Sequence, residues 1–129
     1  MVKCPISRSF RGKIKIMAKK TKLLFICSAN VVRSRTAEDL FKDLSKYEVK
    51  SAGILAESIN HLTQIHLDWA DLIFVMSEEE DHHLTFLKNN FEIKDKKIEV
   101  LGIPNIYPAE GDPALIEVLR KKLVKFLTN

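Results

Sequence analysis

Four consecutive apolar residues, followed by a polar loop and an amphipathic segment, place the strongest constraint on the fold of this chain. Residues 23–26 (LLFI) are flanked by polar side chains, a pattern typical of a strand buried on both faces of a parallel sheet. Residues 36–44 then carry apolar side chains at i, i+3, i+4 and i+7, which indicates one face of a helix. Strand, loop and helix in this order predict the start of a βαβ unit and therefore an α/β fold.

The same alternation recurs along the rest of the chain. Further strands are predicted at residues 47–52, 72–76 and 98–101. Helices are predicted at residues 58–69, from Ser77 as the N-cap to about residue 89, and from Pro113 onward with Asp112 as the N-cap.

Length and composition predict one soluble domain in a reducing compartment. The chain has 129 residues, of which 46% are hydrophobic, enough for a single core. No apolar run approaches the roughly 20 residues of a membrane helix, and no secretory signal follows the basic N-terminus. Two cysteines do not make a disulfide framework, so we expect a cytoplasmic protein.

Basic charge is concentrated at the N-terminus. Residues 1–21 hold seven Lys or Arg and no acid, whereas residues 22–129 hold 14 basic and 17 acidic side chains. We interpret residues 1–21 as a flexible basic leader and residues 22–129 as the folded domain; Met17 is an alternative start. A basic leader could touch nucleic acid or lipid, but an unstructured segment is the simpler interpretation, and no nucleic-acid or membrane partner is expected.

The loop at residues 27–34 (CSANVVRS), between the first strand and the first helix, carries the chemistry. Ligands of open parallel sheets bind at the carboxyl ends of strands, and backbone N–H groups that enter a helix bind anions. A helix N-terminus and the guanidinium of Arg33 both favour the reactive thiolate of Cys27. The planar fork of Arg33 suits phosphate, and Ser34 can donate to the thiolate. This loop is therefore predicted to hold a phosphate-like oxyanion that Cys27 attacks.

Both key residues also have an ordinary structural interpretation. A lone Cys that ends a buried strand is usually a small apolar residue, and an Arg at a helix start is usually solvated. A Cys and an Arg with five residues between them, as in Cys27 and Arg33, also occur together by chance. Placement between a buried strand and a helix favours the functional interpretation of Cys27 and Arg33.

Residues 23–38 (LLFICSANVVRSRTAE) resemble the low-molecular-weight protein tyrosine phosphatases, closest to their short bacterial branch. Residues 51–53, 67–76 and 101–104 also match in order, so the resemblance covers about residues 22–127. It implies a three-layer fold, with a four-stranded parallel sheet, helices on both faces and a phosphate-binding loop after the first strand. It also implies hydrolysis of phosphorylated proteins or small aryl phosphates, without a metal or other cofactor.

The resemblance assigns roles by position. Cys27 would be the nucleophile that forms a phosphocysteine, and Arg33 would bind the phosphate. Asn30 would brace the loop, and Ser34 would assist the thiolate. The residues expected to bind phosphate are Ser28, Ala29, Asn30, Val31, Val32, Arg33 and Ser34.

Three loop positions depart from the family pattern. Ala29 stands where the family usually has Gly, and its methyl group would strain the loop if φ is positive there. Val32 stands where many members carry a second Cys, so this chain cannot form their protective disulfide with the nucleophile. Arg35 replaces the usual Pro.

The general acid is the largest departure. The family places an Asp shortly after Ile-Pro, but this dipeptide at residues 103–104 is followed here by Asn105, which cannot protonate a leaving phenolate. Asp112 is the candidate acid, although a helix N-cap is its simpler role. Loss of a general acid typically costs about 10²–10⁴-fold in rate. Asn105 and Tyr107 are expected at the pocket, where Tyr107 either stacks on an aryl substrate or packs within its loop.

Other chemistry-bearing residues are interpreted structurally. His82 and His83 would point about 100° apart on a helix, so they do not suit one metal ion. Surface, packing or strand-end roles are expected for His61, His66, Trp69 and Asp71, although Asp71 could instead support the active-site loop.

Three functions compete, and the sequence leaves the oligomeric state open. The first is a phosphomonoesterase of the tyrosine phosphatase type. The second is a module that binds phosphate or a phosphoprotein with little turnover, which Ala29 and Asn105 motivate. The third is arsenate reduction, which needs further cysteines to relay a disulfide, and only Cys4 in the leader remains.

Overall fold

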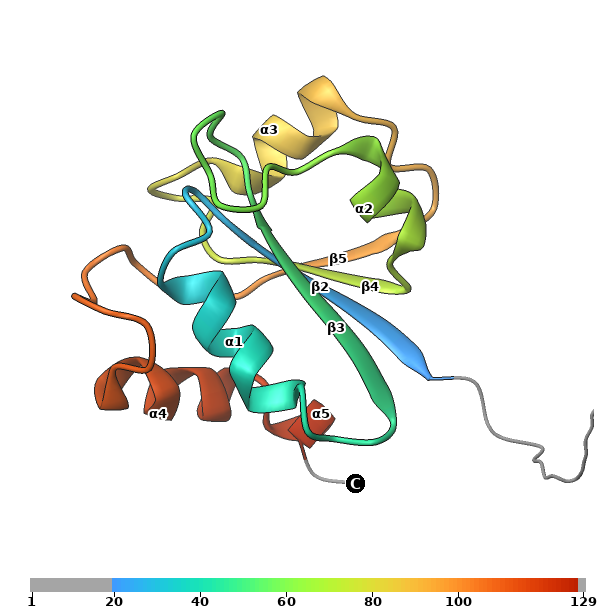
Figure 1. Ribbon diagram of the computed structural model, residues 1–129. Coiled ribbons are helices and arrows are strands. Elements are labelled where there is room, and N and C mark those ends of the chain that lie inside the picture. Colours follow the sequence, from blue (N-terminus) through green and yellow to red (C-terminus); the bar gives the residue numbers. More distant parts are fainter. Residues whose placement is uncertain (1–19, 128–129) are drawn as a thin grey trace, which may run out of the picture.

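The structure is built on a parallel sheet with the strand order β3-β2-β4-β5 (Figure 1). The computed structural model describes residues 20–127. The strands are β2 (Thr21–Cys27), β3 (Tyr47–Gly53), β4 (Leu72–Val75) and β5 (Lys97–Val100). β2 pairs with β3 on one side and with β4 on the other. The chain therefore moves from β2 to β3 on one side and then returns past β2 to β4 on the other side. This reversal of direction creates a ligand-binding switch point at the carboxyl end of β2.

Helices cover both faces of the sheet, so the predicted three-layer α/β fold is confirmed. α1 (Arg33–Phe41), α4 (Pro113–Lys122) and α5 (Val124–Leu127) lie on one face. α2 (Gln64–Trp69) and α3 (His83–Asn90) lie on the other (Figure 1). An apolar cluster fills the space between the sheet and each helical layer.

β2 carries an unbroken apolar run because its side chains enter both clusters. The four side chains from Leu23 to Ile26 have no exposed surface. Phe25 faces the α1–α4 side, where its ring stacks on that of Phe74 in β4 with centroids 5.0 Å apart. Leu24 and Ile26 face the α2–α3 side. The prediction of a central strand at residues 23–26 is confirmed, with the strand extended to Thr21 and Cys27.

The helix predicted to start at Ser77 begins only at His83. The Ser77 hydroxyl accepts a hydrogen bond from the N–H of Glu80 at 3.2 Å, which closes a local turn instead of capping a helix. His82 then adopts a left-handed conformation with φ of 56°, which interrupts the helical path. The N-cap assignment of Ser77 was wrong, and residues 77–82 form a loop between β4 and α3.

Two other helices are shorter or shifted relative to the prediction. Only residues 64–69 of the predicted helix at 58–69 are helical, as α2. The N–H of Gly53 donates to the carbonyl of Asn60, and the N–H of Leu62 donates to the carbonyl of Gly53, both at 2.9 Å. These long-range bonds hold Asn60 and Leu62 beside the end of β3, where His61 forms an isolated bridge with Gly53. The first helix spans residues 33–41 instead of 36–44.

The last helix begins as predicted. Oδ1 of Asp112 accepts hydrogen bonds from the N–H groups of Ala114 and Leu115 at 2.9 and 3.2 Å. Pro113 occupies the first helical position, where its missing N–H removes no intrahelical bond.

The N-terminal prediction is tested only at its boundary. Thr21, assigned to the leader from the sequence, is the first residue of β2. The remainder of the leader up to residue 19, with Cys4 and Met17, lies outside the described residues. Within residues 20–127, no helix is long and apolar enough to cross a bilayer.

Candidate active site

Cys27 and Ser34 meet across the two ends of the loop that joins β2 to α1. The Ser34 hydroxyl oxygen lies 3.0 Å from Sγ of Cys27, and both side chains are buried. Nδ2 of Asn30 donates to the same hydroxyl oxygen at 2.8 Å. When Cys27 is a thiolate, it can only accept, so the Ser34 hydrogen must point at the sulfur. The structure thus brings together the predicted nucleophile and the residue predicted to assist it.

Asn30 braces the loop through its backbone and its side chain. Its φ of 57° lies in the left-handed region, which Asn tolerates better than most residues. Its Oδ1 accepts the N–H of Asn60 at 3.2 Å, which fixes the orientation of the amide. Ala29 is not one of the described residues with a positive φ. The strain considered for its methyl group therefore does not arise.

The chain after β3 supports the outer side of the loop. The N–H groups of Ile54 and Leu55 donate to the carbonyls of Cys27 and Ser28 at 3.1 and 2.9 Å. The Ser58 hydroxyl also donates to the carbonyl of Ser28 at 3.0 Å. These hydrogen bonds satisfy the carbonyls of Cys27 and Ser28 and tie the loop to the segment after β3.

A cavity of about 140 Å³ opens at this loop. Its lining residues are Cys27, Ser28, Ala29, Val31, Val32, Arg33, Leu55 and Asn105. The structure therefore joins Asn105 to the predicted phosphate loop across a long sequence separation. A cavity of this size holds a small anion with one face open to a larger substrate. Leu55 at its wall was not predicted, because its position depends on the fold after β3.

Arg33 is buried and held by two acceptors. Its Nη1 donates to Oδ2 of Asp81 at 2.8 Å and to the carbonyl of Ile103 at 2.9 Å. Only 2% of the Arg33 surface is exposed, which excludes the interpretation as a solvated helix-start residue. A buried guanidinium without a carboxylate would carry a large desolvation cost, and Asp81 offsets it.

Asp81 is the functional residue that the sequence interpretation missed. Partial burial alone would raise the pKa of its carboxyl, but the hydrogen bond and charge of Arg33, with His83 and Ser28, hold that pKa below the ordinary value. Asp81 is therefore ionised at neutral pH and suits a structural ion pair better than proton donation. Its position soon after the carboxyl end of β4 was the available signal, because neighbouring parallel strands end at the same edge of a sheet.

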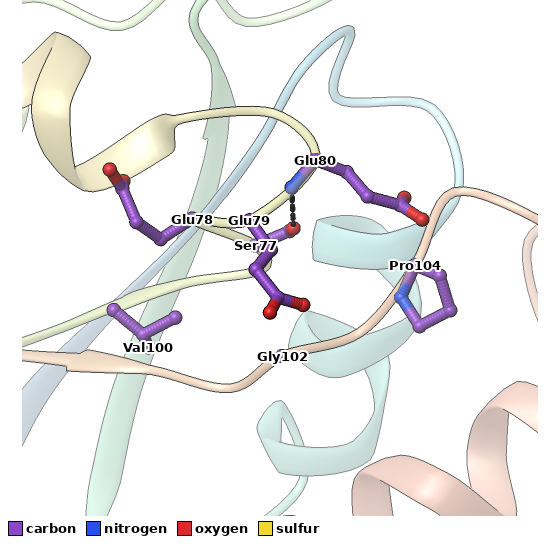
Figure 2. A pocket seen from close by; sticks show the side chains of 7 residues that line it. All are labelled: Ser77, Glu78, Glu79, Glu80, Val100, Gly102 and Pro104. Atoms are coloured by element: carbon purple, nitrogen blue, oxygen red, sulfur yellow. Dashed lines mark hydrogen bonds between the residues drawn. The ribbon is translucent and has the colours of Figure 1, made fainter.

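Asn105 lines the Cys27 cavity, and its neighbour Pro104 lines a larger cavity of about 490 Å³. Figure 2 shows the larger cavity, where the Glu80 side chain extends toward Pro104. Oε1 of Glu80 accepts the backbone N–H of Asn105 at 3.4 Å. The larger cavity does not contain Cys27, so size alone does not identify the reactive site. Asn105, which stands where the family resemblance implies an Asp, thus lines the same cavity as Cys27.

Asp112 and Tyr107 lie apart from the Cys27 cavity lining. The Asp112 carboxylate caps α4, and Tyr107 packs against the core on the α1–α4 side. These contacts match the helix-cap role considered for Asp112 and the packing role considered for Tyr107. The assignment of Asp112 as general acid stays a prediction.

The other residues singled out have local partners. Nδ1 of His66 accepts the N–H of Thr63 at 3.0 Å, and Oδ2 of Asp71 accepts the N–H of Lys22 at 2.9 Å. That bond lies near the start of β2, whereas the active-site loop follows the end of this strand. Asp71 therefore does not support the loop. Trp69 is only partly buried, against the cluster on the α2–α3 side. In residues 20–127, no three His, Cys, Asp or Glu side chains are grouped to hold a metal.

Comparisons with known proteins point to one family. The model of the family described as low molecular weight phosphotyrosine protein phosphatase matches residues 22–66. A comparison with curated protein sequences gives no match. The family match includes the whole Cys27 loop and the segment that braces it.

Solved structures of phosphatases share the fold. The tyrosine phosphatase Wzb from Escherichia coli K30, in complex with phosphate, is 18% identical, with a TM-score of 0.67, covering 84% of this chain and 96% of that one. A protein tyrosine phosphatase from Entamoeba histolytica is 21% identical, with a TM-score of 0.62 and coverage of 84% and 94%. The YwlE arginine phosphatase from Geobacillus stearothermophilus is 28% identical, with a TM-score of 0.54 and coverage of 84% and 86%. The chain is thus similar to the low-molecular-weight phosphotyrosine protein phosphatases in sequence over residues 22–66 and to solved phosphatases in fold.

Proposed function

We propose that the protein is a cysteine-dependent phosphomonoesterase that acts on phosphorylated proteins, with phosphotyrosine as the expected substrate class. The observation that carries this proposal is the 3.0 Å contact between Cys27 and Ser34 in a cavity that Arg33 also lines. A nucleophile, a hydroxyl that stabilises its thiolate and a buried cation converge there on a space of anion size.

The reaction would proceed in two displacements at phosphorus. The Cys27 thiolate attacks the phosphoryl group, so an S–P bond forms while the ester P–O bond breaks, and the leaving oxygen takes a proton. Arg33 and the loop N–H groups stabilise the charge on the non-bridging oxygens. Water then attacks the phosphocysteine and releases phosphate, and Ser34 donates a hydrogen bond to the departing thiolate.

The residue that protonates the leaving oxygen determines how fast such an enzyme would turn over. Asp112 remains the predicted acid, but its engagement at the α4 N-cap and the amide at Asn105 favour weak acid assistance. Without strong acid assistance, we expect slow turnover of alkyl and poorly activated aryl esters and better turnover of substrates with good leaving groups. A module that only binds phosphate is not favoured, because the solved structures compared above are phosphatases.

The cellular setting is proposed on chemical grounds. A nucleophilic thiol without a disulfide partner functions best in a reducing compartment, so we place the protein in the cytoplasm. Residues 1–20, the part of the predicted leader that precedes β2, are proposed to take no part in the chemistry.

The experiment is turnover of p-nitrophenyl phosphate, with phosphotyrosine and phosphoarginine peptides compared in parallel. The phosphoarginine peptide is included because the Geobacillus relative is an arginine phosphatase. Cys27→Ser is expected to abolish turnover, whereas Cys4→Ser, the same chemical change in the leader, is expected to leave it unchanged. A rapid-quench experiment with ³²P-labelled substrate should trap label on Cys27. Full activity of Cys27→Ser would refute the proposal.

A further inference from the structure

His83 is buried against the phosphate loop although it belongs to α3. Its Nδ1 accepts the backbone N–H of Ser77 at 3.1 Å, and its Nε2 lies 3.1 Å from the hydroxyl of Ser28. Ser28 follows the nucleophile directly. A buried imidazole that contacts the catalytic loop without facing the substrate cavity has no part in the reaction proposed above, so its role needs a separate explanation.

The hydrogen positions along this contact follow from the backbone. A backbone N–H can only donate, so Nδ1 of His83 must be an unprotonated acceptor and the ring hydrogen lies on Nε2. Nε2–H therefore donates to Ser28, and the Ser28 hydroxyl hydrogen is directed to Oδ1 of Asp81 at 3.3 Å. Burial lowers the pKa of His83 to about 4, an effect that Arg33 reinforces and Asp81 opposes. The ring is therefore neutral at neutral pH, as this chain of bonds requires.

The chain of hydrogen bonds ends on the cation that is proposed to hold phosphate. Oδ1 of Asp81 is oriented by Ser28, and Oδ2 accepts Nη1 of Arg33 at 2.8 Å. Nη1 also donates to Ile103, so both of its hydrogens are directed away from the anion. The donors on Nε and Nη2 form the edge that matches two oxygens of a phosphate.

We propose that His83 is a positioning residue that acts through Ser28 and Asp81 to turn the Nε–Nη2 edge of Arg33 toward the phosphate. This inference rests on the proposed function of the loop as a phosphate site. It predicts that loss of the imidazole hydrogen bonds weakens oxyanion binding even where the fold is intact. A side chain that only fills space at the start of α3 would affect stability alone.

The test compares His83→Gln with His83→Leu. A Gln amide can accept from the Ser77 N–H and donate to Ser28, whereas Leu can do neither. We expect His83→Leu to raise the inhibition constant of inorganic phosphate and the KM for p-nitrophenyl phosphate by about tenfold, the upper end of the cost of one lost neutral hydrogen bond. His83→Gln should stay within about threefold. His82→Gln is the matched control, because its side chain is 70% exposed, and it should change neither constant.

Thermal unfolding of each variant separates positioning from packing. If His83→Leu folds and binds phosphate as tightly as the natural protein, the positioning role is wrong. The same conclusion follows if His83→Gln loses affinity as strongly as His83→Leu while melting at the natural temperature. A double-mutant cycle of Ser28→Ala with His83→Leu should be strongly non-additive, and additive losses would contradict the relay.

NMR of the natural protein gives a measurement that does not depend on folding of a variant. Long-range ¹H–¹⁵N spectra should show His83 as the Nε2–H tautomer, with resonances that shift when phosphate binds, and an Nδ1–H tautomer would overturn the proposal. Phosphate affinity is measured by calorimetry, which requires no turnover. A protein that binds phosphate in a His83-dependent way but does not hydrolyse esters would refute the proposed function and leave this inference intact.

Discussion

The hydroxyl oxygen of Ser34 lies 3.0 Å from the sulfur of Cys27 and also accepts a hydrogen bond from Asn30. The bond from Asn30 holds the Ser34 oxygen in place and leaves its hydrogen available for the sulfur. In a two-step displacement, the sulfur regains negative charge when phosphocysteine is hydrolysed. The contact is therefore expected to matter most in the second step.

Ser34→Ala should slow hydrolysis of the phosphocysteine more than its formation. We expect a fall in kcat of about tenfold to a hundredfold, the cost of one hydrogen bond to a charged group, with a visible burst of p-nitrophenol. Stopped-flow absorbance measures the burst and the steady rate separately. Ser45→Ala, in the turn before β3, is the matched control. An equal loss in both phases would contradict a leaving-group role for Ser34.

Stability should fall as the pH is lowered from about 6.5 toward 4. His83 has a folded-state pKa of about 4 and an unfolded value of 6.5, so the unfolded chain binds more protons in this window. The stabilisation from the neutral ring is complete above about pH 6.5 and is lost on acidification, by at most about 3 kcal/mol. Asp81, whose pKa is also lowered, adds a further loss below its unfolded value of 3.8. Urea unfolding at a series of pH values measures the slope.

His83→Gln should flatten this pH dependence because an amide does not titrate. His82→Gln serves as the control and should retain the natural slope, since that side chain is 70% exposed. A slope that His83→Gln leaves unchanged would assign the effect to other groups, such as His66, whose pKa burial also lowers.

Asn105→Asp should increase the rate for substrates with poor leaving groups. A carboxyl at the rim of the Cys27 cavity could protonate the leaving oxygen, which contributes up to about 10²–10⁴-fold in other enzymes. The dependence of kcat/KM on leaving-group pKa, measured with a series of substituted phenyl phosphates, should become less steep. Asn89→Asp, exposed on α3, is the control. No change in steepness would exclude a vacant acid position at residue 105.

Asp112→Asn tests the competing assignment with little risk to the fold. Asn is as good an N-cap as Asp, so α4 should keep its cap and the melting temperature should change little. If Asp112 is the acid, the rate should fall most for poor leaving groups. An equal rate across the whole series would remove Asp112 from the mechanism and leave its role as the cap of α4.

Gly53→Ala should damage the phosphate loop from outside. A Cβ atom at Gly53 would lie 2.7 Å from the Ser28 carbonyl oxygen and 2.8 Å from the Asn30 nitrogen, both backbone atoms that cannot rotate away. We expect a destabilisation of about 1–3 kcal/mol together with a loss of phosphate affinity. Gly111→Ala, where a Cβ meets no atom within 4 Å but φ is +84°, should cost about 1 kcal/mol without changing affinity. Calorimetry with phosphate distinguishes the two variants.

The features that local pattern predicted are those set by neighbouring residues. The buried run at residues 23–26, the helix after Cys27 and the Asp112 cap each depend on side chains within a few positions. The loop from Cys27 to Ser34 was predicted for the same reason, since strand, loop and helix are consecutive.

The features that local pattern missed depend on contacts between distant segments. Asp81 reaches Arg33 across 48 positions, and its place after β4 points to the acidic run at residues 78–81 without separating Asp81 from the three Glu residues before it. The helix start moved from Ser77 to His83 because the Ser77 hydroxyl binds the N–H of Glu80 in a local turn and His82 adopts a left-handed conformation. Asn60 and Leu62 stay outside a helix because both bind Gly53 at the end of β3.

The bracing of the loop by residues 53–60 links anion binding to the cooperativity of the whole domain. Ile54, Leu55 and Asn60 donate hydrogen bonds to this loop from beyond β3, so the site cannot assemble until that strand has docked beside β2. Any anion held there is released on unfolding and raises the free energy of unfolding by RT ln(1 + [L]/Kd). Amide hydrogen exchange of this distant segment should therefore slow as phosphate is added, and the segment would report occupancy of a cavity that most of it does not line.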